Sequence, residues 1–223
     1  MTNPGTDKRP LEVEKTILIL LAAGRSTRFG DDNKLDEPFL NRPLGVHVAV
    51  ALEKMPFQER IAIVDSAVID YAAHRFRVMH NPDPDQGMAS SLRIGVGCAK
   101  ELGADAVLIA LADMPRVTAA HIYRMFDATE GPGSVVASSD GEDTKPPALF
   151  GRDHFDQLLA LKGALGARDL VRGGRHVVAS DAELIDVDTP ADLERLRALV
   201  HSKEAITRAT ERRTGGENVG DAV

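Results

Sequence analysis

The sequence predicts an α/β protein with a mostly parallel sheet and helices on both of its faces. Continuous apolar runs at 16–23 (TILILLAA) and 104–111 (ADAVLIAL) are typical of strands that are buried on both faces. Along the chain such runs alternate with segments of helical composition, for example 87–102, which indicates βαβ units. Ligands bind at the carboxyl ends of the strands in sheets of this kind. We therefore expect functional residues in the loops that follow strands.

The other elements are predicted from the same patterns. Further strands are expected at 60–64, 76–79, 134–137, 148–150, 176–179 and 184–187. Further helices are expected at 44–55, 118–128 and 154–161, and from 190 onwards. Pro43 and Thr118 supply start signals, and Thr189 would cap the last helix with Pro190 at its first position and Asp192 three residues beyond the cap.

Composition restricts the classes of function. The chain has 223 residues, a net charge of −7 and no Trp, which argues against a nucleic-acid binder or a base-stacking platform. Its one cysteine, Cys98, forms no internal disulfide or structural zinc site, and we expect it to pack inside a helix. No segment has the apolar length of a membrane span or of a signal peptide. A cytoplasmic chain without nucleic-acid or membrane partners is expected.

One large domain is expected between two polar ends. Residues 1–15 are interpreted as a polar leader and 16–200 as the domain. Residues 201–223 are interpreted as a polar tail that continues the last helix and then frays.

The loop LLAAGRSTRFGDDNK at 20–34 suits phosphate binding. Gly24 and Gly30 permit positive φ, and the small residues 22–24 let the backbone approach a ligand. The loop carries three cations, Arg25, Arg28 and Lys34. It is neither a Walker loop nor a dinucleotide fingerprint, because the required glycine spacings are absent. On spacing alone, a turn with solvated arginines is an equally good interpretation.

Carboxylates follow two other expected strands. Asp113, in LADMP at 111–115, is placed to hold Mg²⁺ against the phosphates of a nucleotide, or else to cap a turn. Asp186 and Asp188 alternate along the expected strand and so point the same way. We expect Asp188 to supply a second carboxylate, and Asp186 and Asp192 to be ordinary charges at the start of a helix.

The segment HNPDPDQGMASSL at 80–92 joins a strand to a helix. With Gly87 at the helix start, backbone groups and small hydroxyls such as Ser91 could read a base edge. Simple capping is the alternative, with Met88 as a flexible packing residue. Candidate anion ligands for a second substrate lie farther along, although lone residues of this kind are more often at the surface: Arg152, His154 and Arg168.

The motifs occur in an order that resembles the MobA-like nucleotidyltransferases of the molybdenum cofactor, most closely their cytidylyltransferase branch. The resemblance covers about residues 16–200 and rests on LLAAGRSTRFGDDNKL, NPDPDQGMASSL, LADMP, PPALFGRDHFDQLLALKGALGAR and DVDTPADL. It implies a Rossmann-like, GT-A-type fold. It also implies Mg²⁺-dependent transfer of CMP from CTP to the phosphate of molybdopterin, with release of pyrophosphate. The implied recipient of the product is a molybdoenzyme of the xanthine dehydrogenase type.

The resemblance also assigns roles to matching positions. The triphosphate would be held by Leu21, Ala22, Ala23, Gly24, Arg25 and Lys34, with Arg28, Lys34 and Asp113 acting in catalysis. Base and ribose would lie near Gly87, Met88 and Ser91, Asn81 would be a further nucleotide-binding residue, and Mg²⁺ would be bound by Asp113 and Asp188. Ala23 favours CTP, because guanylyltransferase relatives resemble LAGG where this chain has LAAG.

Two departures from the family pattern leave alternatives open. Ala164 stands where an acidic side chain is common, and Pro84 where an aromatic one is. A guanylyltransferase, or another nucleotidyltransferase with a different phosphorylated acceptor, remains an alternative. So does a non-catalytic module that presents the cofactor to a molybdoenzyme. Against that module stands the joint retention of Arg28, Lys34, Asp113 and Asp188, a set that a pure binder does not need.

Overall fold

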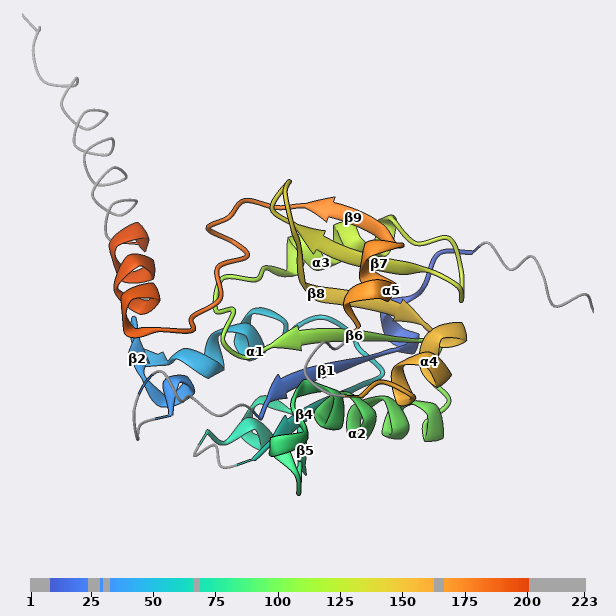
Figure 1. Ribbon diagram of the computed structural model, residues 1–223, viewed down its shortest axis with the longest axis horizontal. Coiled ribbons are helices and arrows are strands. Elements are labelled where there is room, and N and C mark those ends of the chain that lie inside the picture. Colours follow the sequence, from blue (N-terminus) through green and yellow to red (C-terminus); the bar gives the residue numbers. More distant parts are fainter. Residues whose placement is uncertain (1–8, 24–28, 30–32, 66–68, 163–166, 201–223) are drawn as a thin grey trace, which may run out of the picture.

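The computed structural model describes residues 9–23, 29, 33–65, 69–162 and 167–200. Seven strands form one sheet in the order β5-β4-β1-β6-β8-β7-β9 (Figure 1). Their bounds are Thr16–Ala22 (β1), Glu59–Val64 (β4), Arg77–His80 (β5), Ala106–Leu111 (β6), Val135–Ser139 (β7), Thr144–Gly151 (β8) and Arg175–Val178 (β9). Neighbouring strands are parallel except where β8 is one of the pair. A separate hairpin pairs β2 (Pro38–Phe39) with β3 (Arg42–Pro43).

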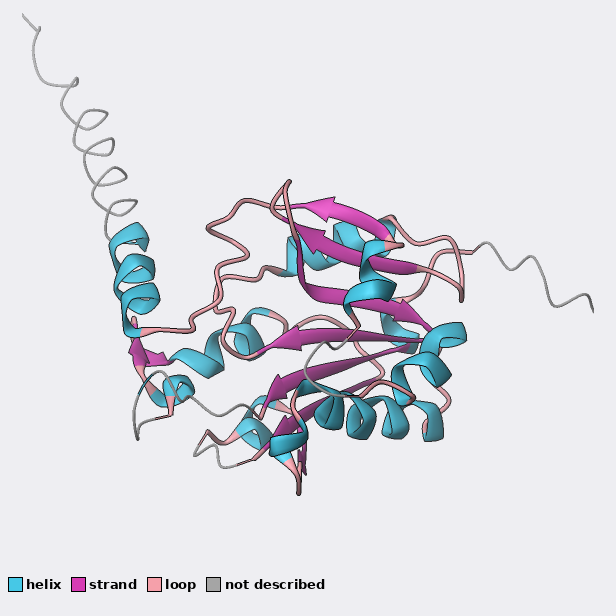
Figure 2. Cartoon of the chain, in the orientation of Figure 1, coloured by secondary structure: helices cyan, strands magenta, loops and turns pink. Residues whose placement is uncertain are grey.

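Helices cover both faces of the sheet (Figure 2). The α-helices are α1 (His47–Ala51), α2 (Met88–Glu101), α3 (Ala119–Asp127), α4 (Phe155–Leu159) and α5 (Arg168–Arg172), and residues 190–200 are also helical. The short 3-10 turns are η1 (Val13–Lys15), η3 (Lys34–Asp36), η4 (Leu44–Val46), η5 (Tyr71–His74), η6 (Pro84–Gln86) and η7 (Arg152–His154). No helix among the described residues has the length and apolar character that crossing a membrane requires.

β1 shows why helices are needed on both faces. Ile17 and Ile19 pack with α2 and α4 in one core cluster, whereas Leu18 and Leu20 pack with α1 and α3 in another. All seven residues of β1 are buried, which is what its unbroken apolar run predicted. The predicted fold class, a mostly parallel α/β sheet of the Rossmann-like type, is confirmed.

The two predicted helix caps are also confirmed. The Thr118 hydroxyl accepts a hydrogen bond from the His121 amide at 3.1 Å, and α3 follows. At the last helix, the Asp192 amide donates to the Thr189 hydroxyl at 3.2 Å while the Thr189 amide donates to Asp192 Oδ2 at 2.9 Å. This reciprocal pair satisfies backbone donors that the first helical turn leaves without partners.

Three expected elements differ in the structure. Residues 184–187 are not a strand; Ile185 and Val187 pack against Leu193 and the β2–β3 hairpin, so burial occurs there without sheet pairing. The helix expected over 44–55 divides into η4 and the short α1. Residues 1–15, expected to be a polar leader, contribute to the core, because the side chains at 11 and 13 are buried there. The tail from 201 lies outside the described residues.

The direction of β8 fixes which loops lie at which end of the sheet. The parallel strands β1, β4, β5 and β6 end at one edge, which we name the carboxyl edge, and begin at the other, the amino edge. Antiparallel β8 begins at the carboxyl edge and ends at the amino edge. Lys145 therefore lies at the carboxyl edge, and Arg152 lies at the amino edge.

Candidate active site

A lysine bridges two carboxylates at the carboxyl edge. Lys34 Nζ lies 2.7 Å from Asp113 Oδ2 and 3.0 Å from Asp188 Oδ1. The Lys34 and Asp113 side chains are only 13% and 19% exposed, and that of Asp188 is 45% exposed. Residues that are 79 and 154 positions away from Lys34 in the sequence thus meet at one ammonium group.

Local structure holds each of the three in place. The Asn33 side chain caps η3 by accepting from the Leu35 amide at 3.1 Å, and the buried Leu35 anchors the turn that begins with Lys34. Asp113 follows β6 directly. The Val187 amide donates to the Asp113 carbonyl at 3.0 Å, which keeps Asp188 beside it.

The two carboxylates shift the pKa values of the groups around them. Burial lowers the pKa of Lys34, but the attraction of Asp113 and hydrogen bonds to Asp113 and Asp188 outweigh it, so that the pKa is raised overall. Desolvation, followed by the charges of Asp113 and Asp188, raises the pKa of the neighbouring Asp186. Lys34 is therefore a full cation at neutral pH, surrounded by carboxylates.

A cavity of about 330 Å³ opens beside this group. It is lined by Leu21, Ala22, Ala23, Lys34, Leu35, Pro84, Asp85, Gly87, Met88, Ser91, Leu111 and Asp113. The structure thus brings together most of the described residues that the sequence indicated for nucleotide binding. They come from the loops after β1, β5 and β6, as the carboxyl-edge rule predicted.

The glycine at the start of α2 has a backbone that few other residues adopt. Gly87 has φ 76° and ψ −168°, in a region that is essentially restricted to glycine. A second cavity, of about 580 Å³, shares Asp85 and Gly87 with the first and extends toward the end of α4. Gly87 is therefore placed between two hollows at the N-terminus of a 14-residue helix.

Asn81, which the sequence indicated for nucleotide binding, is not among the residues that line this cavity. It is buried, and its Nδ2 donates to Ser90 Oγ at 2.7 Å and to Ser91 Oγ at 2.9 Å. Its Oδ1 accepts from the Asp83 amide at 3.0 Å. Asn81 thus ties the end of β5 to the first turn of α2, and it supports the cavity from behind.

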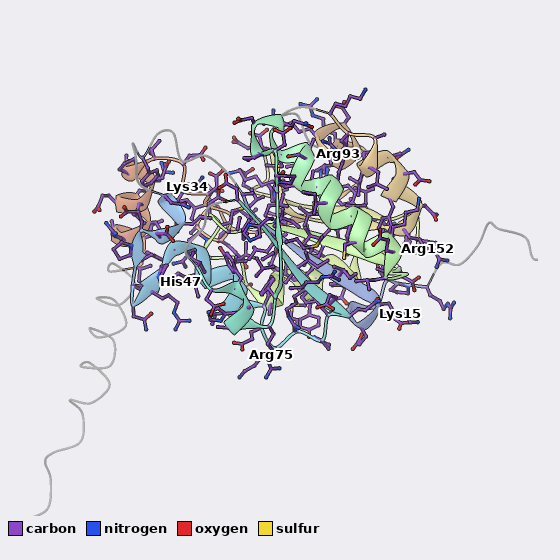
Figure 3. All side chains as sticks on the ribbon, turned by 90° about the horizontal axis from the view of Figure 1, so that it is seen from below. Lys15, Lys34, His47, Arg75, Arg93 and Arg152 are labelled. Carbon is purple, nitrogen blue, oxygen red and sulfur yellow. The ribbon has the colours of Figure 1, made fainter. Side chains whose placement is uncertain are left out.

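Two of the residues expected to bind the second substrate, Arg152 and His154, are not brought to this site. Arg152 pairs with Asp105 at 2.7 Å, and His154 Nε2 contacts the Gly133 carbonyl at 3.0 Å, both at the amino edge. Figure 3 shows Arg152 beside Lys15, across the molecule from Lys34. Arg168 is an exposed residue at the start of α5. The expectations for Gly24, Arg25, Arg28, Gly30 and Ala164 concern positions outside the described residues.

A charged cavity of about 490 Å³ at the carboxyl edge escaped the sequence analysis. Its lining includes Asp140, Lys145, Asp181, Asp186 and Arg195. Lys145 Nζ lies 2.6 Å from Asp140 Oδ2, and that hydrogen bond, opposed by desolvation, raises the pKa of Lys145. The motif that begins with PPALFGR follows Lys145 directly, but only the antiparallel direction of β8 places Lys145 at the carboxyl edge.

The donor set fits a hard divalent cation such as Mg²⁺. Asp113 Oδ1 is buried and has no hydrogen-bond partner among the described residues, so it is available as a ligand. No group of three or more His, Cys, Asp or Glu side chains placed to hold a metal is found in the described ranges. Two carboxylates, with phosphate oxygens and waters, are the ligands that Mg²⁺ usually takes.

Sequence comparison adds to this geometry. The MobA-like NTP transferase domain matches residues 18–180. The chain belongs to this family. The purine catabolism protein PucB of Bacillus subtilis is 30% identical over 196 residues, covering 80% of this chain and 94% of PucB. The phosphoenolpyruvate guanylyltransferase of Sphaerobacter thermophilus is 31% identical over 164 residues, covering 67% of this chain and 75% of that protein.

Structural comparison agrees. The structure of Rv0371C of Mycobacterium tuberculosis in complex with manganese superposes with a TM-score of 0.63 at 26% identity, covering 82% of this chain and 98% of the other. MobA-like NTP transferases act on nucleoside triphosphates, and family members use a divalent metal. The chain is therefore a nucleotidyltransferase of the MobA-like family.

Proposed function

We propose that this nucleotidyltransferase moves CMP from CTP to the phosphate of molybdenum-loaded molybdopterin and releases pyrophosphate, with Mg²⁺ bound by Asp113 and Asp188. The observation that carries the proposal is the Lys34–Asp113–Asp188 group beside a 330 Å³ cavity at the ends of β1 and β6. A cation, two carboxylates and a close-approach backbone are what a magnesium triphosphate requires.

The cavity suits a nucleotide in its size and lining. Its floor is the backbone at Ala22 and Ala23, where small side chains leave room for phosphate oxygens. Gly87 and the first turn of α2 offer amide groups at a helix N-terminus, and Ser91 adds a hydroxyl. We propose that the base and ribose lie against this turn. Ala23 in LAAG supports CTP, and Arg25 and Arg28 complete the proposed phosphate ligands.

Nucleotidyl transfer requires that the two substrates are aligned and that the negative charge of the phosphates is compensated. A phosphate oxygen of the acceptor forms a bond to the α-phosphorus of CTP, and the bond from that phosphorus to the bridging oxygen of pyrophosphate breaks. The acceptor phosphate is already an anion at neutral pH, so no general base is needed. Lys34 stabilises negative charge on the phosphates, and Asp113 and Asp188 would hold a divalent cation, which would supply further charge neutralisation.

The acceptor must approach from the side of β6 that is away from the nucleotide, because the attacking and leaving oxygens lie roughly in line. The cavity lined by Lys145 and Asp186 is on that side. We therefore propose it as the place of the acceptor, in preference to Arg152 and His154 at the amino edge. The PucB relative is named for purine catabolism, and xanthine is a purine, which supports a recipient of the xanthine dehydrogenase type.

The test is a pyrophosphate-release assay on the full chain. Each of the four nucleoside triphosphates is supplied with Mg²⁺ and molybdenum-loaded molybdopterin, and the nucleotide adduct is identified by mass spectrometry. CTP-dependent release with a CMP adduct is expected. Release with GTP alone contradicts the proposal. No release with any nucleotide, while the cofactor still binds, supports a cofactor-presenting module.

A guanylyl transfer is the second candidate, because the Sphaerobacter relative is named a phosphoenolpyruvate guanylyltransferase. Supplying phosphoenolpyruvate with GTP in the same assay tests it directly. The carboxylates Asp140, Asp181 and Asp186 in the proposed acceptor cavity repel an acceptor that carries a carboxylate of its own, which favours the first candidate.

A further inference from the structure

Lys34 occupies the place that a cation held by Asp113 and Asp188 would take. Its Nζ touches one oxygen of each carboxylate, at 2.7 and 3.0 Å. A divalent cation held by these carboxylates would take oxygens of the same two side chains as ligands. The ammonium group and the ion thus compete for one location.

The competition is strong because the location is sheltered. The Lys34 and Asp113 side chains are mostly buried, so water screens the charges only weakly. A divalent cation placed beside the ammonium group would meet a like charge at close range. It would also find the Asp188 Oδ1 and Asp113 Oδ2 oxygens already hydrogen-bonded.

The cavity offers the Lys34 ammonium group an alternative position. Lys34 lines the same 330 Å³ space as Ala22, Ala23 and Gly87, where the triphosphate is proposed to bind. Lysine has a flexible four-carbon stem and a point charge, so its ammonium can turn from the carboxylates to a phosphate. A triphosphate in this cavity offers the ammonium a new anionic partner and vacates the position between the carboxylates.

Resting on the function proposed above, we propose that Lys34 is a placeholder for the divalent cation. The ammonium group neutralises Asp113 and Asp188 until a nucleoside triphosphate draws it away, and only then does the cation enter between them. The chain alone therefore binds the cation weakly, and the nucleotide and the cation strengthen each other's binding through Lys34. This coupling is reciprocal, as linkage requires. When pyrophosphate leaves, Lys34 returns and expels the cation.

The experiment measures Mn²⁺ binding to the full chain without nucleotide, from the electron paramagnetic resonance signal of free Mn²⁺. Lys34→Gln removes the ammonium, so its chain is expected to bind Mn²⁺ about tenfold more tightly than the wild type. Lys100→Gln is the matched control. It removes the positive charge with which Lys100 of α2 pairs with Asp156 of α4, far from the site, and is expected to leave Mn²⁺ affinity unchanged.

The outcomes separate this inference from the proposed function. Equal or weaker Mn²⁺ binding by Lys34→Gln overturns the placeholder role. Asp113→Asn is expected to abolish the tighter binding of the Lys34→Gln chain. If Asp113→Asn leaves Mn²⁺ binding in the presence of CTP unchanged, the metal site itself is refuted, and the proposed function loses its main support.

A second measurement needs no variant. Crystals of the wild-type chain soaked in Mn²⁺ alone are expected to show no anomalous peak between Asp113 and Asp188. With Mn²⁺ and CTP together, the peak is expected to appear, with Lys34 Nζ on the triphosphate. A peak bridging the two carboxylates while Lys34 still bonds to both overturns the inference.

Discussion

The two edges of the sheet carry nearly the same ion pair in different surroundings. At the carboxyl edge, Lys34 lies 2.7 Å from Asp113, and at the amino edge, Arg152 lies 2.7 Å from Asp105. The Arg152 and Asp105 side chains are 55% and 36% exposed, whereas both members of the Lys34 pair are largely buried. Water therefore screens the amino-edge pair, and we expect it to contribute little to stability.

A lysine–aspartate or arginine–aspartate ion pair is therefore not sufficient to identify a functional site. At the carboxyl edge a second carboxylate shares the lysine, one Asp113 oxygen has no hydrogen-bond partner among the described residues, and a cavity adjoins the group. At the amino edge, Arg152 lines a small hollow of about 40 Å³. Matched changes at one residue of the carboxyl edge and one of the amino edge test whether the two edges differ in function.

The largest effect is expected from Asp113→Asn. The amide cannot supply the negative charge that holds a divalent cation, so nucleotidyl transfer should fall by about a hundredfold or more. Asp105→Asn is the matched change at the amino edge and should leave turnover within about twofold. Pyrophosphate release with CTP measures both, and equal losses in the two variants would show that the edges do not differ in function.

The next effect is expected from Gly87→Ala. Alanine at φ 76° and ψ −168° costs roughly 1–3 kcal/mol, and its methyl group is attached beside the cavity. The dissociation constant for CTP should rise by roughly ten- to a hundredfold, measured by calorimetry with Mg²⁺ present.

Gly103→Ala is its control at the amino edge. Gly103 also has a positive φ, 68°, but a methyl group there meets no atom within 4 Å. This variant should lose about 1 kcal/mol of stability and bind CTP normally. Unchanged CTP binding in both variants would remove Gly87 from the proposed nucleotide site.

A smaller effect is expected from Lys145→Gln. If the acceptor lies in the cavity beside Asp186, losing this cation should raise the KM for molybdenum-loaded molybdopterin about three- to tenfold while the KM for CTP stays the same. Arg152→Gln, at the amino edge, should change neither constant. The reverse result, with Arg152→Gln raising the acceptor KM, would restore the interpretation made from the sequence.

Lys145 and Arg152 also show which features of the fold could not be predicted from the sequence. Local signals were sufficient for the caps at Thr118 and Thr189 and for Asp113, because each depends on its immediate neighbours in the chain. The direction of β8 depends on which strands it pairs with, and no residue in it records that. Lys145 lies near the start of β8 and Arg152 comes directly after its end, so the direction of this strand decides which edge of the sheet each of them joins.

The same limit applied to Asn81 and to residues 184–187. Asn81 carries an amide of the kind that binds ligands, but this amide is buried. Its Nδ2 donates hydrogen bonds to the hydroxyl groups of Ser90 and Ser91 in α2. The apolar alternation at 184–187 matched a strand, yet its side chains pack on the last helix and the β2–β3 hairpin. In both cases the partner that decides the outcome comes from another part of the chain.

The smallest effect expected is a difference in alkaline stability between the two edges. The pKa of Lys34 is raised above its usual 10.5, so the stabilisation from its pair is fully present below 10.5 and is lost as the pH rises through the raised value. A guanidinium group is effectively always protonated, so arginine pairs do not respond to this change of pH. The melting temperature of Lys34→Met should therefore lie below that of the wild type at pH 9, and the gap should narrow by pH 11. The small difference in melting temperature between Arg152→Met and the wild type should stay constant from pH 9 to pH 11. If both differences changed with pH in the same way, the two ion pairs would be equally screened by water.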